Sequence, residues 1–200
     1  MIKKISFILT FFFLIRLISS CCEEGYKFQW SKVDLENITG IKSDNPTIIT
    51  SDSCDFNEFG FRISFSHTKV AGLPNNIGFN TAKAFDCEPL YSNANKIVKY
   101  SIVSLVDYNS THKSGTNISD IIEGREIDFK RFTPNKGFVS IDSIVTIVNM
   151  MQGGKINDYS FDCKLKESPD KNKDLLIAIK FEFENGSILT DTTKMIKIKI

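Results

Sequence analysis

The fold class that the sequence predicts is mainly β, and three observations lead to it. Apolar and polar residues alternate with a period of two in several segments. Turn-forming residues separate these segments at short intervals, and only one segment has its apolar residues at helical spacing. Short strands joined by regular turns are typical of two packed sheets. We therefore expect an immunoglobulin-like two-sheet β-sandwich with one short helix.

The first twenty residues have the pattern of a cleaved signal peptide. Lys3 and Lys4 precede an apolar run over residues 5–15, and Arg16 interrupts the apolar character after it. A helix that spans the hydrocarbon core of a bilayer needs about 20 apolar residues, so this run is too short for a permanent membrane helix. The leader predicts export followed by proteolytic removal.

The leader ends in a stretch that is similar to a bacterial lipobox. Ile18 lies at −3, the small residues Ser19 and Ser20 lie at −2 and −1, and Cys21 follows. Cys22 fits less well as the acylated residue because it would place Ser19 at −3. The sequence thus predicts a lipoprotein signal peptide over residues 1–20, with lipid on Cys21. The alternative is an ordinary signal peptide without a lipid.

Length and charge set limits on the rest of the chain. We expect a short tether over residues 21–25 and a single domain over 26–200, since this length suffices for one core but is short for two. The leader carries three basic residues and no acidic ones, so its removal changes the formal net charge from +1 to −2. A nearly neutral chain has no electrostatic basis for binding nucleic acid. Membrane attachment is expected through the lipid.

Cysteine usage supports an exported protein. After acylation of Cys21, four cysteines remain, which are Cys22, Cys54, Cys87 and Cys163. Their spacings do not match a zinc knuckle or a redox motif, so two disulfides are the better expectation. Three connectivities are open, with a weak preference for Cys22 bonded to Cys87. We expect no metal and no cofactor.

The body of the domain divides into strands. In the clearest one, residues 59–66, four large apolar side chains face one way and Gly, Arg, Ser and Ser face the other. Asn185-Gly186 predicts a hairpin turn. Lys197 and Lys199 alternate with isoleucines in the last strand, which is typical of an edge strand protected from aggregation. Further strands are expected over residues 26–31, 97–106, 159–165, 175–183 and 188–200.

One segment favours a helix. Its apolar residues at helical spacing are Ile141, Ile144, Val145, Val148 and Met151. Ser140 can cap its start, and Gly153-Gly154 can end it. We expect the apolar stripe to pack on a sheet.

No catalytic constellation stands out in the sequence. His67 and His112 lie in polar surroundings, where a surface position is the better expectation, and no Gly-x-Ser-x-Gly elbow is present. Asp52, Asp55 and Glu58 are clustered, but their spacing does not match a calcium loop. We therefore expect a protein without enzymatic activity.

Trp30 is the side chain for which a role in ligand binding has to be considered. Together with Tyr26 and Phe28 it lies on one face of a strand, where aromatic rings can stack on sugars. The better expectation is that these rings fill the core, because large aromatic side chains dominate core energetics. An exposed Trp30 would favour sugar binding, and a buried one would not.

Three stretches carry a resemblance to a known group of proteins. They are the doubled Cys21-Cys22 after the lipobox, the segment over residues 82–87, and Asn185-Gly186-Ser187 followed by Thr192-Thr193-Lys194. The chain resembles uncharacterised envelope lipoproteins of Bacteroidota, and the acidic residues of Cys22-Glu23-Glu24-Gly25 resemble the surface-export signal of such proteins. The resemblance implies an outer-membrane lipoprotein that faces the periplasm or the cell surface, with no catalytic residues to transfer.

These observations leave three functions open. The first is a non-catalytic binding or accessory module with an unidentified protein or glycan partner. The second is a glycan-binding subunit of a surface uptake system, which predicts an exposed Trp30. The third is a hydrolase, which predicts His67 or His112 in a cleft beside an acid and a nucleophile.

Overall fold

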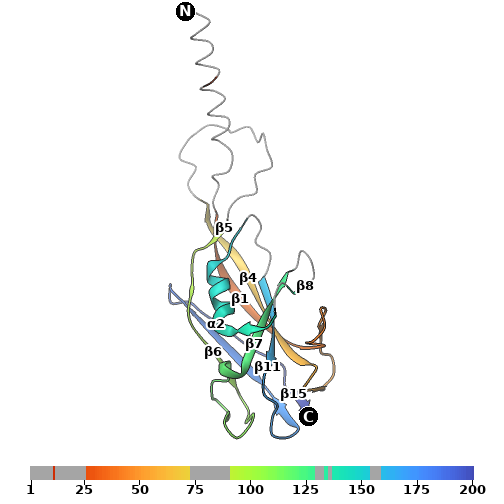
Figure 1. Cartoon of the computed structure of the whole chain (residues 1–200). Coiled ribbons are helices and arrows are strands. Elements are labelled where there is room, and N and C mark those ends of the chain that lie inside the picture. Colours follow the sequence, from red (N-terminus) through yellow and green to blue (C-terminus); the bar gives the residue numbers. More distant parts are fainter. Residues whose placement is uncertain (1–10, 12–25, 73–90, 129–132, 135–136, 154–158) are drawn as a thin grey trace, which may run out of the picture.

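The computed structural model describes residues 11, 26–72, 91–128, 133–134, 137–153 and 159–200 (Figure 1). Apart from Phe11, the expected signal peptide, lipobox and tether, and with them Ile18, Ser19, Ser20, Cys21 and Cys22, lie outside these residues, as does Cys87. Among the residues that the structure describes, no helix combines the length and the apolar character needed to span a bilayer.

The described chain forms a β-sandwich, and its first layer is a large mixed sheet. Two long antiparallel strands, β1 (Tyr26–Thr39) and β4 (Phe59–Gly72), run along its whole length (Figure 1). The sheet has the order β10-β5-β1-β4-β11-β7-β8, with β2 added to β1 and β9 added to β7. The shorter strands are β2 (Thr47–Ile48), β5 (Tyr91–Asn93), β7 (Ile122–Asp128), β8 (Thr133–Pro134), β9 (Val139–Ser140), β10 (Gln152–Gly153) and β11 (Tyr159–Leu165).

The second layer is built on an interrupted C-terminal hairpin. Its outer half pairs β13 (Ile177–Phe183) with β14 (Ile188–Thr192), and β6 (Ile97–Ser104) joins β13. Its inner half pairs β12 (Lys173–Leu175) with β15 (Ile196–Lys199), and β3 (Ser53–Asp55) joins β15 in parallel. Residues 185–186 make the turn, as predicted, with Gly186 at φ +80°.

The core lies between the two layers and has the alternation that the sequence predicts. Phe59, Phe61, Ile63 and Phe65 of β4 are all buried, and the ring of Phe65 lies 5.0 Å from that of Phe181 on β13. Burial of each such side chain stabilises the fold by about 1.5–3 kcal/mol. The mainly β sandwich with one α-helix is therefore confirmed.

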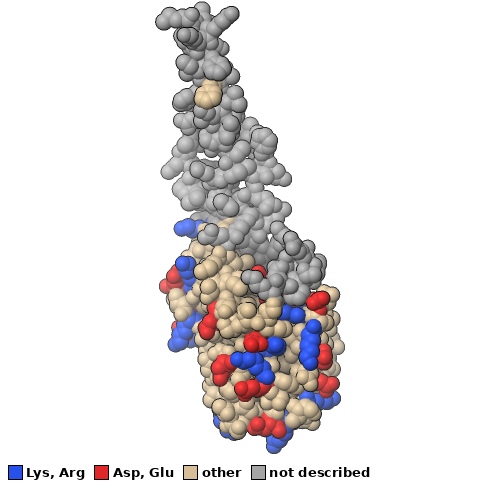
Figure 2. Space-filling model, viewed as in Figure 1, with Lys and Arg blue, Asp and Glu red and all other residues tan. Residues whose placement is uncertain are grey.

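The opposite face of the large sheet is polar and is covered in part. Arg62 of β4 donates from Nε to Oδ1 of Asp162 on β11 at 2.8 Å, and the Ser160 hydroxyl donates to Ser64 Oγ at 2.8 Å. The side chain of Asp162 is fully buried. On the molecular face in Figure 2, acidic and basic side chains are interspersed over the described body.

The helical segment forms as predicted and packs beside β7. Helix α2 (Ile141–Met150) begins at Ser140, whose hydroxyl accepts from the Ser143 N–H, and it buries Ile141, Ile144 and Val148. The expected end at Gly153-Gly154 is wrong, because the helix stops at Met150 and Gly153 belongs to β10. A 3-10 turn, η1 (Ser119–Ile121), precedes β7.

The last strand corrects another expectation. β15 lies between β12 and β3, so it is the central strand of its three-stranded sheet and not an edge. Lys197 and Lys199 are exposed, while Ile196 and Ile198 are buried in the core. Their alternation reports a sheet with one solvated face and carries no information about the strand's position in it.

Candidate functional site

Trp30 is a core residue. Its side chain is 3% exposed, and its ring lies 5.0 Å from Phe28, 5.2 Å from Phe65 and 6.5 Å from Tyr159. The ring therefore offers no face to a sugar, and the ligand-stacking role is corrected to a packing role. The physical reason is that β1 alternates its side chains, and the face with Phe28 and Trp30 is the buried one, where Trp30 packs on Phe65 of β4.

The two histidines differ in their surroundings. The ring of His67 is half-buried against Phe28 at 5.8 Å and Trp30 at 6.4 Å. His112 is only 6% exposed, so the expectation of a surface position is wrong for it. Its Nδ1 lies 3.1 Å from Asn109 Oδ1, and its Nε2 lies 3.2 Å from Asp120 Oδ2. Both ring nitrogens are engaged in holding the loop that follows β6.

The disulfide expectation is wrong for the two cysteines that the structure describes. Cys54 on β3 and Cys163 on β11 are free thiols, and they belong to different sheets. Cys163 lies inside the core, where burial, followed by the nearby charge of Asp162, raises the pKa of its thiol well above the ordinary value. The bond between Cys22 and Cys87 stays a prediction.

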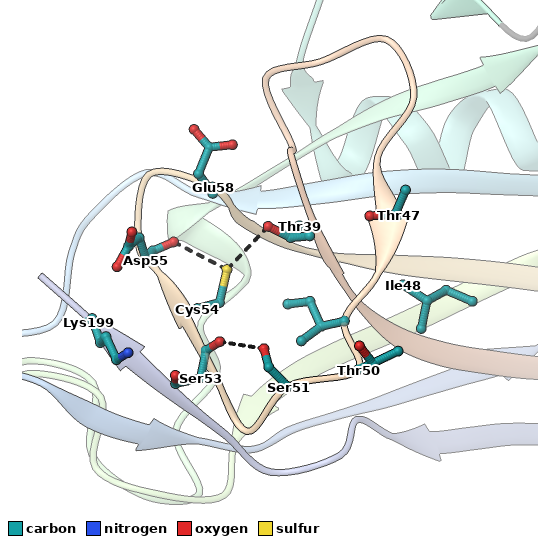
Figure 3. Close-up of a pocket in the computed structure, with 11 residues that line it drawn as sticks. Thr39, Thr47, Ile48, Thr50, Ser51, Ser53, Cys54, Asp55, Glu58 and Lys199 are labelled. Atoms are coloured by element: carbon teal, nitrogen blue, oxygen red, sulfur yellow. Dashed lines mark hydrogen bonds between the residues drawn. The ribbon is translucent and has the colours of Figure 1, made fainter.

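A pocket lies where the chain crosses from one layer to the other. β2 belongs to the large sheet and β3 to the second layer, so residues 47–55 form a β-arch. A cavity of about 390 Å³ opens inside this arch, between the end of β1 and the end of β15 (Figure 3). We name it the arch pocket.

Turns and strand pairing hold the arch in place. Gly40, at φ +73°, reverses the chain after β1, and its carbonyl accepts from the Ser43 N–H at 2.8 Å. Thr39 then pairs with Thr47 in the large sheet. On the other side of the pocket, Asp55 pairs with Lys199 in parallel.

A thiol and a hydroxyl form the floor of the arch pocket. Cys54 Sγ lies 3.5 Å from Thr39 Oγ1 and 3.5 Å from the main-chain oxygen of Asp55 (Figure 3). The Ser51 hydroxyl donates to the main-chain oxygen of Ser53 at 2.8 Å and closes the tip of the arch. Cys54 is part of the hydrophobic core and also lines the pocket, so the core borders the pocket at this residue.

The lining of the arch pocket as a whole is rich in hydrogen-bonding groups. Hydroxyls come from Thr39, Thr47, Thr50, Ser51 and Ser53. Carboxylates come from Asp55 and Glu58, an ammonium from Lys199, and apolar surface from Ile48 and Ile49. Within the described part of the chain, none of these three charged side chains has an ion-pair partner. This arrangement can donate and accept hydrogen bonds in several directions.

The second pocket, of about 270 Å³, lies at the start of α2 and differs in kind. The Tyr100 hydroxyl donates to Asp142 Oδ1 at 2.7 Å, and burial, with this bond and the charge of Asp142, raises the pKa of Tyr100 to about 12. Asp120 bonds to His112, and Glu123 pairs with Lys164 at 3.3 Å. The phenol of Tyr100 and the carboxylates of Asp120, Glu123 and Asp142 therefore already have partners, inside the pocket or beside it.

The sequence points to the arch pocket only in part. The acidic cluster contributes Asp55 and Glu58 to the lining, whereas Asp52 contributes its main-chain oxygen to the Lys197 N–H. The described residues contain no group of ligands suited to a metal ion. The density of Thr and Ser between residues 47 and 53 was a usable signal, but the same residue types also make ordinary turns.

The N-terminal pattern and the arch pocket are the two features with functional content. The N-terminal pattern precedes β1, which begins at Tyr26, whereas the arch pocket lies at the other end of this strand. No protein-family model matches the chain, and no curated protein matches it in sequence.

Proposed function

We propose that the chain is a lipid-anchored protein of the cell envelope whose β-sandwich serves as a non-catalytic binding or accessory module. Acylated Cys21 would hold it on the outer membrane, facing the periplasm or the cell surface. The lipobox pattern over residues 18–21 and the resemblance to Bacteroidota envelope lipoproteins support the anchor. Two or more acyl chains are sufficient for stable attachment.

The position of the arch pocket carries the binding half of the proposal. β1, which runs along the large sheet (Figure 1), begins at Tyr26, directly after the expected tether, and ends at Thr39, which lines the pocket. Its 14 residues would extend over about 45 Å at about 3.3 Å per residue. An anchor at one end of β1 would leave the pocket open on the side away from the lipid.

The surroundings of the histidines favour binding over hydrolysis. A hydrolase of the triad type needs a histidine nitrogen that is free to take a proton from a nucleophile. Both nitrogens of His112 contact other side chains, and the arch pocket has no histidine among its described lining residues. The pocket instead offers hydroxyls, two carboxylates and an ammonium to a bound partner.

Intact-mass analysis of the mature protein tests the anchor, with two matched variants. The unchanged chain and Cys22→Ala are expected to begin at residue 21 with an acylated N-terminus and to fractionate with membranes. Cys21→Ala is expected to lose the acyl mass and to leave the membrane fraction. An unacylated N-terminus in the unchanged chain, or acylation that persists in Cys21→Ala, would contradict the proposal.

A further inference from the structure

We propose that the arch pocket binds a neutral polyhydroxylated ligand, a saccharide, through hydroxyl and carboxylate groups without aromatic stacking. This inference rests on the proposed binding function and names its ligand class. It starts from a contrast between the two pockets. At the start of α2, Tyr100 bonds to Asp142 and Asp120 bonds to His112, so these groups already have partners. In the arch pocket, Asp55, Glu58 and Lys199 have none among the described residues.

The lining has the hydrogen-bonding pattern that a polyol requires. Each sugar hydroxyl both donates and accepts. The carboxylates of Asp55 and Glu58 accept only, Lys199 donates only, and the hydroxyls of Thr47, Thr50 and Ser53 can do both, whereas those of Thr39 and Ser51 already have partners. A carboxylate with two oxygens can accept from two neighbouring hydroxyls, and such charge-assisted bonds are the stronger ones.

The charge of the lining favours a neutral ligand. Two carboxylates and one ammonium leave the pocket with a formal charge of −1. This sign opposes an anionic group, which would have to approach Asp55 and Glu58. A single unbalanced carboxylate also provides little basis for selecting a small cation, and the described residues contain no set of metal ligands.

Apolar surface and size fit the same ligand class. Ile48 is 53% exposed and lies at the rim (Figure 3), and Ile49 is also part of the lining. The exposed aliphatic side chain of Ile48 can cover the C–H face of a sugar ring. The cavity, at about 390 Å³, falls within the range of about 300–1,000 Å³ that small-molecule sites occupy.

A glycan microarray probed with detergent-solubilised full-length protein tests the ligand class. We expect retention on at least one neutral glycan, and weaker or no retention on sialylated or sulfated forms of the same glycan. The strongest neutral oligosaccharide is then titrated against purified variants. Asp55→Asn and Glu58→Gln are expected to weaken its binding about tenfold or more, because each removes a charged acceptor.

Asp174→Asn provides the matched control. Asp174 is exposed on β12 in the same three-stranded sheet as Asp55 but does not line the pocket, so its variant should bind like the unchanged chain. Circular dichroism and thermal unfolding would verify that each variant folds.

If the protein is retained on none of the neutral glycans of the array, or if it prefers anionic glycans, the ligand class is overturned. Equal binding by Asp55→Asn, Glu58→Gln and Asp174→Asn would overturn the site. The anchor is measured separately by mass. Acylation without glycan binding would remove only this inference, and glycan binding without acylation would remove only the anchor.

Discussion

At the scale of single residues, alternation predicts which side chains share a face but not whether that face is covered. Tyr159, Phe161 and Cys163 enter the core as the pattern predicts. Asp162 points the other way, and the pattern would place it in solvent, yet it is fully buried. A segment distant in sequence explains the burial of Asp162. Arg125 of β7 pairs in register with Asp162 and donates to the main-chain oxygen of Ser43, which brings the turn after β1 to this face of the sheet.

Asp162 is expected to be the most sensitive charged residue of the large sheet. Arg62 donates to both carboxylate oxygens of Asp162, and Asp162→Ala would leave this partly buried guanidinium without an acceptor. We expect a loss of about 3–5 kcal/mol in the free energy of unfolding, measured by urea denaturation.

Asp34→Ala is the control for that change. Asp34 forms an exposed ion pair with Lys32 at 2.6 Å, and the expected loss is about 0–1 kcal/mol. Similar losses in the two variants would contradict the burial of the Asp162–Arg62 ion pair.

At the scale of elements, local signals were sufficient where neighbours in sequence meet. The turn at Gly186 and the cap at Ser140 each depend on a few consecutive residues, and both form as predicted. The position of β15 depends on the pairing of Ile198 with Cys54, which lies far away in sequence. No local pattern could reveal that pairing, so the lysines of β15 suggested an edge.

Two glycines isolate the contribution of the hairpin turn. A Cβ added at Gly186 or at Gly137 meets no heavy atom within 4 Å, but only Gly186 has a positive φ, of +80°. Gly186→Ala is therefore expected to lower the free energy of unfolding by about 1–2 kcal/mol through backbone strain alone. Gly137→Ala should leave the stability unchanged or slightly higher, and an equal loss at both positions would refute the turn conformation.

At the scale of the whole molecule, the fold class was predictable because it depends on patterns repeated along the chain. The arch pocket was not, since it forms where the end of β1, the arch over residues 47–55 and the C-terminal strand meet. Contacts between β14 and β1 show the same limit. Asp191 Oδ2 accepts from the Leu35 N–H at 2.6 Å and joins the two layers over a long sequence separation.

The titration of buried groups predicts a loss of stability at alkaline pH. Burial raises the pKa of Tyr108, Tyr159 and Cys163 above their ordinary values, and that of Tyr100 to about 12. Above the ordinary tyrosine pKa near 10, the unfolded chain loses these protons while the folded chain keeps them. The unfolded state then binds fewer protons, so stability falls as pH rises, by up to about 1.4 kcal/mol per pH unit for each of Tyr108, Tyr159 and Cys163 and by less for the partly exposed Tyr100.

Tyr159→Phe tests this linkage. The Tyr159 hydroxyl is buried without a hydrogen-bond partner among the described residues, so its removal should cost little at pH 7. Between pH 9.5 and 11, urea denaturation of this variant should show a shallower fall in stability than the unchanged chain. Parallel pH profiles would mean that the hydroxyl is not shielded from water.

The central claim is that lipid holds one end of β1 while the arch pocket lies at the other. Its most direct test places a genetically encoded fluorescent amino acid at position 70 or 199 of the acylated protein, in vesicles with a headgroup quencher. Val70 is exposed on β4 beside the first residues of β1, and Lys199 lines the pocket. Strong quenching at position 70 and little at 199 is the predicted result, whereas equal quenching, or stronger quenching at 199, would contradict the claim.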